Sequence, residues 1–190
     1  MKKNDEIQAK WRDTINDIIS SDVVEKIIGN ELFIKENGKL AENREVHIKY
    51  LSSNCHAFRM DLQPHSIYLF QDDIKINDEL LLYIEKDKIT VFIMELKSNN
   101  PKDAIPQIRN GKLCADLLIG ILEAKIGYRF PNREYRGYIF TSKQNGKNTV
   151  SRKAFLKCDS ILDENIYIKV FNKSPFYSFK DLSRPMRRKN

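Results

Sequence analysis

The stretch INDELLLYIEKDKITVFIMELK, residues 76–97, decides the fold. Its two apolar runs flank a short polar segment, which predicts two antiparallel strands joined by a tight turn. A two-residue turn at 86–87 pairs residues whose numbers add to 173, and a four-residue loop over 85–88 gives the same register. Asp78 then faces Glu95, with Cβ atoms about 5 Å apart. A three-residue loop would shift the register by one residue and turn Asp78 to the other face.

The second run ends in Glu95 and Lys97, which share one face because strand side chains alternate. Two opposed carboxylates repel each other unless a cation compensates them. Lys97 supplies part of this compensation, and a hard divalent ion such as Mg²⁺ (or Mn²⁺) would supply more. Asp78, Glu95 and the backbone carbonyl of Leu96 could hold that ion together with water. The alternative is a solvated strand end with an ion pair worth at most about 1 kcal/mol.

The order of Asp, apolar strand, turn, apolar strand and Glu-x-Lys resembles the PD-(D/E)XK nuclease superfamily, which has a restriction-endonuclease-like fold. The resemblance covers residues 75–110. It implies that Asp78 and Glu95 are metal ligands and that Lys97 is the catalytic lysine. Several branches of the superfamily also carry a glutamine on the following helix, and Gln107 in DAIPQIRNG matches that position.

The chain departs from the superfamily pattern at two points. Asn77 stands where the motif has proline. Many members of the superfamily add an acidic ligand from an N-terminal helix, and Glu6, Glu25 and Glu31 are all candidates for this role. The residues alone do not choose among the three.

Hydrophobic periodicity predicts a mixed α/β (α+β) fold in which helices flank one central mixed sheet. The resemblance implies that this core is restriction-endonuclease-like. Helices are expected over residues 5–20, 21–29, 106–125 and 151–158. Strands besides the hairpin are expected over residues 44–52, 55–62, 66–70, 135–142 and 165–172. We expect one nuclease-like domain over 1–190, with N-terminal helices in 1–30, a core over 45–170 and a mobile basic tail over 183–190.

The positive charge is unevenly placed along the chain. The net charge is +7, and residues 131–190 hold 14 Lys and Arg against 5 Asp and Glu. This excess predicts a surface for a polyanion such as nucleic acid, although a lysine-rich solvated surface would give the same count. The candidate nucleic-acid contacts are Arg136, Lys143, Lys147, Arg152 and Lys153.

Other classes of function find little support in the sequence. The three cysteines are widely spaced and the three histidines show no zinc-site spacing, which favours a cytoplasmic protein without a disulfide framework. No apolar run approaches the ~20 residues that span a bilayer. The chain has neither a phosphate-binding P-loop nor a dinucleotide fingerprint.

The expected function is hydrolysis of phosphodiester bonds by an endo- or exonuclease, with DNA favoured over RNA by the habit of the superfamily. Restriction, repair, recombination and phage defence are the contexts that the resemblance implies. Because the chain is little larger than a catalytic core, we expect a homodimer or a partner protein to provide targeting. The alternatives are an inactive nucleic-acid-binding or interaction module of the same fold, and a hydrolase of smaller phosphodiesters.

Overall fold

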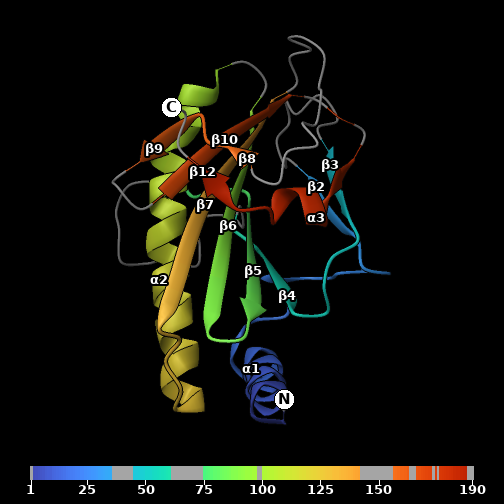
Figure 1. Ribbon diagram of the computed structural model, residues 1–190, viewed down its shortest axis with the longest axis vertical. Coiled ribbons are helices and arrows are strands. Elements are labelled where there is room, and N and C mark those ends of the chain that lie inside the picture. The colour runs from blue at the N-terminus through green and yellow to red at the C-terminus, as the bar shows by residue number, and fades with distance from the viewer. Residues whose placement is uncertain are drawn as a thin grey trace.

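The computed structural model describes residues 2–35, 45–60, 75–97, 100–141, 156–162, 166–172, 174 and 176–187. Its centre is a seven-stranded sheet in the order β1-β4-β5-β6-β7-β10-β9 (Figure 1). In that order the strands are Val24–Glu25, Cys55–Arg59, Glu79–Glu85, Lys88–Lys97, Asn132–Thr141, Ile166–Asn172 and Ser160–Leu162. The pairs from β1 to β6 are antiparallel, β7 and β10 continue parallel to β6, and β9 is antiparallel. The predicted central mixed sheet is therefore confirmed.

The β5–β6 hairpin has the predicted register. Ile84 pairs with Ile89 and Leu80 with Ile93, across a two-residue turn in which Lys86 has a φ of 53°. The predicted pairing of the two strands, and with it the set of residues that share a face, is therefore confirmed.

Helix α2, Ile105–Ile126, follows the short 3-10 turn η2, Pro101–Ala104. It forms the crossover that a parallel β6–β7 pair requires. Its buried side is apolar or small where it packs on the sheet, and Gly127 ends the helix at a φ of 67°. The predicted helix over 106–125 and its stop at Gly127 are confirmed.

Helix α1, Lys2–Ile18, packs against the same layer at the end of the sheet nearest the β5–β6 turn (Figure 1). Trp11 is completely buried, and its ring meets Phe130 edge-on with centroids 5.4 Å apart. The two long helices and one face of the sheet thus enclose a single apolar core.

A second core lies on the other face of the sheet. It is covered by a three-stranded sheet of β2 (Leu32–Lys35), β3 (Glu45–Lys49) and β11 (Tyr177–Ser178), and by the short helix α3 (Phe179–Leu182). The alternating burial of β2 and β3 fits strands with one covered face. The strand expected over 44–52 is confirmed, whereas β2 and β9 were not predicted.

Three expectations need correction. Residues 21–29 do not form a helix: Val24–Glu25 is strand β1, because its backbone pairs with β4. Within the segment expected as a helix over 151–158, Leu156–Lys157 is strand β8, which pairs with β12, Met186–Arg187. That pairing also holds part of the tail that we expected to be mobile. The strand expected over 66–70 lies outside the described residues.

The described part of the chain contains no helix both long and apolar enough to cross a membrane.

Candidate functional site

The hairpin register brings Asp78 and Glu95 together. The last paired residues of β5 and β6 are Glu79 and Met94, so Asp78 and Glu95 stand one step beyond them. Two hydrogen bonds join the strands there. The Asp78 N–H donates to Glu95 Oε2 at 3.1 Å, and the Leu96 N–H donates to Asp78 Oδ2 at 2.6 Å. The two carboxylates are therefore held side by side by backbone donors.

Glu95 lies at the end of the sheet face that α2 covers. Its neighbours two and four residues back, Ile93 and Val91, belong to the apolar core of that face. The Glu95 side chain is 1% exposed, and Lys97 Nζ lies 2.6 Å from its Oε1. Burial raises the pKa of Glu95, while the ammonium of Lys97 and the Asp78 N–H act in the opposite direction. The ion pair with Lys97 thus offsets part of the cost of burying a carboxylate at this position.

Gln107 joins the site from the first turn of α2, just after Pro106. Its side chain lowers the pKa of the Glu95 carboxylate, against the effect of burial. Its Nε2 donates to the Ile76 carbonyl at 3.4 Å. The structure therefore brings the four predicted site residues together: Asp78, Glu95, Lys97 and Gln107.

Asn77 and Gly111 support this arrangement, and neither was predicted to do so. Asn77 is completely buried, and its Nδ2 donates to the Glu79 carbonyl at 2.6 Å and reaches the Met94 carbonyl at 3.5 Å. Gly111 lies so close that an added Cβ would stand 2.1 Å from Asn77 Oδ1. The segment before β5 is therefore clamped between β6 and α2. The signal in the sequence was a glycine on the inner face of a predicted helix.

The donor set suits a hard divalent cation. Carboxylate oxygens of Asp78 and Glu95 lie beside the backbone of Leu96, and Mg²⁺ binds through one or two carboxylates while keeping several waters. No group of three or more His, Cys, Asp and Glu side chains within the described ranges is placed to hold a metal. These residues therefore fit a Mg²⁺ ion that has few protein ligands and several waters.

None of the three N-terminal acids is placed beside Asp78 and Glu95. Glu6 is an exposed residue of α1 that pairs with Lys10, and Glu31 accepts a 2.8 Å hydrogen bond from His47. Glu25 pairs with Ala57 on β4, which in turn pairs with Leu81, so it shares the opposite face of the sheet.

Arg136 is not a surface contact for nucleic acid. It is 3% exposed, and its guanidinium donates to Glu134 at 2.7 Å and to the carbonyls of Leu182 and Arg184 at 2.9 and 2.8 Å. Side chains of β7 alternate between the two faces of the sheet, and this places Arg136 under the C-terminal segment, residues 182–187. The other candidate contacts, Lys143, Lys147, Arg152 and Lys153, lie outside the described residues.

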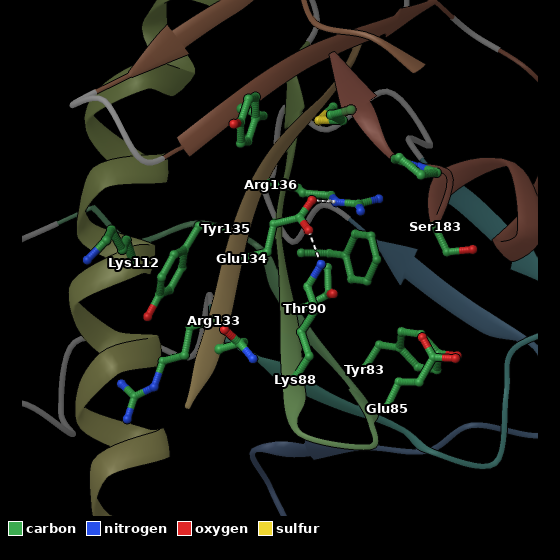
Figure 2. A pocket seen from close by; sticks show the side chains of 15 residues that line it. Tyr83, Glu85, Lys88, Thr90, Lys112, Arg133, Glu134, Tyr135, Arg136 and Ser183 are labelled. Atoms are coloured by element: carbon green, nitrogen blue, oxygen red, sulfur yellow. Dashed lines mark hydrogen bonds and ion pairs between the residues drawn. The ribbon is translucent and has the colours of Figure 1, made fainter. Parts of the chain in front are cut away.

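A pocket of about 930 Å³ lies apart from the four site residues, along the first half of β7 (Figure 2). An ion network crosses it, because Glu134 binds both Arg136 and Lys88. On the side of the pocket formed by α2, Lys112 Nζ lies 4.6 Å from the centroid of the Tyr135 ring. Sequence reasoning did not find this pocket, because its lining comes from segments far apart in the chain.

Comparison of the chain with models of protein families, with curated proteins and with solved structures finds no match. The resemblance to the PD-(D/E)XK superfamily therefore rests on the residues and spacing of 75–110 and on the geometry of the four side chains.

Proposed function

We propose that this protein is a metal-dependent nuclease of restriction-endonuclease-like fold that hydrolyses phosphodiester bonds in nucleic acid. The observation that carries the proposal is the cluster of Asp78, Glu95, Lys97 and Gln107 at one end of an apolar sheet face. The charge of a buried carboxylate is costly unless a cation compensates it. A second carboxylate beside it adds to that cost, and such costly arrangements are typical of functional sites.

Each side chain has a role in this proposal. Asp78, Glu95 and the Leu96 carbonyl would hold Mg²⁺ or Mn²⁺, which when bound polarises the phosphoryl oxygen and lowers the pKa of water. Lys97 would orient the attacking water or stabilise the negative charge that develops in the transition state. Gln107 would help to orient the metal-bound water, the lysine or the substrate backbone, and it lowers the pKa of the Glu95 carboxylate.

The proposed substrate is DNA, on the habit of the superfamily, and the basic excess of residues 131–190 supports a polyanionic substrate. Defence, restriction and repair are the proposed settings, and a homodimer or a targeting partner would supply specificity.

The test is a cleavage assay with Mg²⁺ or Mn²⁺ against EDTA on linear and circular duplex DNA, single-stranded DNA and RNA. Wild type is compared with Asp78→Asn, Glu95→Gln and Lys97→Met, and with Lys112→Met as a control. Lys112 also pairs with a carboxylate at 2.6 Å and is exposed to a similar degree, but it lies outside the site. Metal-dependent cutting lost in the three site variants and kept in the control supports the proposal. Absence of cutting with every substrate and either metal contradicts it.

A second candidate, an inactive nucleic-acid-binding module of the same fold, is favoured by one observation. Both oxygens of Glu95 already have donors from the chain itself. In an inactive module this closed arrangement would be permanent, and neither metal would change the melting temperature of wild type. Nucleic-acid binding without metal binding would support this candidate.

A further inference from the structure

The Glu95 carboxylate is held from both sides by the protein's own donors. Lys97 Nζ lies 2.6 Å from Oε1, and the Asp78 N–H lies 3.1 Å from Oε2. The ammonium of Lys97 is the one cationic partner among the contacts described for this carboxylate. Any cation that Glu95 ligates therefore meets a charge that is already present.

A cation bound to Glu95 Oε1 would lie close to the ammonium of Lys97. Mg²⁺ binds an oxygen ligand at about 2.1 Å. Because the ammonium is 2.6 Å from Oε1, a cation on the same oxygen would lie within about 4.7 Å of Nζ. Like charges at this separation repel strongly at a site shielded from water.

The two partners differ in their freedom to move. Glu95 is 1% exposed and enclosed by strands and helix, whereas Lys97 is 23% exposed and is the last residue of β6. A lysine carries its ammonium on a flexible four-carbon stem and can turn it toward solvent. Lys97 is therefore the partner whose side chain moves when a cation binds.

We propose that Lys97 is an internal counter-ion that takes the place of the divalent cation at Glu95, and that cation binding displaces its ammonium toward the rim of the site. This inference rests on the proposed function and adds a regulatory step to it. Lys97 is released for work on the phosphodiester only when the cation is bound.

The experiment is isothermal titration calorimetry of Mn²⁺ binding without nucleic acid, at fixed ionic strength and pH. Wild type, Lys97→Met, Lys97→Gln, Lys112→Met and Glu95→Gln are compared. We expect both Lys97 variants to bind Mn²⁺ about tenfold or more tightly than wild type, which corresponds to roughly 1.4 kcal/mol. Lys112→Met should bind as wild type does, and Glu95→Gln should lose most of the affinity. The Lys97 variants should nevertheless not cleave.

The possible outcomes separate this inference from the proposed function. If wild type binds Mn²⁺ and the Lys97 variants bind it equally or more weakly, the counter-ion role is wrong while the nuclease proposal stands. If neither wild type nor any variant binds Mn²⁺, both are wrong. If a Lys97 variant folds poorly, the Mn²⁺-induced rise in melting temperature replaces the titration, because binding to the folded state alone raises it. That rise must then be larger in the Lys97 variant than in wild type, or the inference fails.

Discussion

At the scale of the residue, the Glu95–Lys97 pair is asymmetric in its exposure. The Glu95 side chain is 1% exposed, whereas that of Lys97 is 23% exposed at the strand end. Removing one partner of a buried ion pair is costly because the other charge is left uncompensated. The cost must therefore depend on which partner is removed.

Lys97→Met should lower the free energy of unfolding by about 2 kcal/mol or more, because it leaves the buried Glu95 carboxylate without its cation. Glu95→Gln should change it by less than about 1 kcal/mol, because the remaining ammonium can be hydrated. Chemical denaturation in EDTA measures both. Equal losses in the two variants would show that Glu95 is not the constrained partner.

His56 gives the protein a defined acid sensitivity. Burial, helped by the charge of Arg12, lowers the pKa of His56 from 6.5 to about 4. The unfolded chain therefore binds more protons than the native state between these values, and stability falls as the pH drops from about 6.5 to 4. The loss should reach up to about 3 kcal/mol, since one pKa unit corresponds to about 1.4 kcal/mol.

Denaturation at pH 7 and pH 4 checks this, with His56→Gln as the comparison. The variant should lose less stability than wild type on acidification. An identical pH dependence in both proteins would assign the acid sensitivity to other groups.

At the scale of the element, the contact of α2 with the segment before β5 sets the distance between Gln107 and Asp78. Gly111 makes this possible because it has no side chain where Asn77 presses against the helix. The helix also contains a matched glycine, Gly120, whose added Cβ would meet nothing within 4 Å. Replacement by alanine should therefore have opposite effects on stability at the two glycines.

Gly111→Ala should destabilise the protein by about 1–3 kcal/mol through overpacking. Gly120→Ala should stabilise it by about 0.5–1 kcal/mol through helix propensity alone. Thermal denaturation of both variants measures the contrast.

The double variant Asn77→Ala/Gly111→Ala tests the cause. It should lose less stability than the sum of the two single changes, because the smaller residue 77 removes the closest contact of the new methyl group, although Ile93 Cγ2 at 2.6 Å keeps part of the overpacking. Additive losses would place the clash elsewhere.

At the scale of the whole molecule, the buried Arg136 ties the C-terminal segment to the central sheet. It donates to the carbonyls of Leu182 and Arg184, and the Tyr138 hydroxyl donates to Leu182 at 2.5 Å. This segment covers the second core, where Leu182 and Phe179 are buried. Arg136 therefore has a structural role, because it holds the C-terminal segment against the central sheet.

Arg136→Met should expose the backbone amides of Ser183, Arg184, Met186 and Arg187 to faster hydrogen exchange, because the Arg184 carbonyl loses its Arg136 donor and the Leu182 carbonyl keeps only that of Tyr138. Lys88→Met is the matched control, since Lys88 binds the same Glu134 and its described contacts do not reach the segment. Hydrogen exchange followed by mass spectrometry measures both. Unchanged exchange in Arg136→Met would show that apolar packing alone holds the segment.

The sequence by itself determined the hairpin of 76–97, the register that sets Asp78 beside Glu95, and the helix that carries Gln107. These features follow from local rules: the period of the side chains, a tight turn, and a glycine stop. Only the tertiary structure decided the close contact of Asn77 with Gly111 and the burial of Arg136. It also decided that β1 pairs with β4 and that β8 pairs with β12. Each of these depends on a partner distant in the chain, and a local pattern cannot name a partner because burial and backbone pairing are properties of the assembled fold.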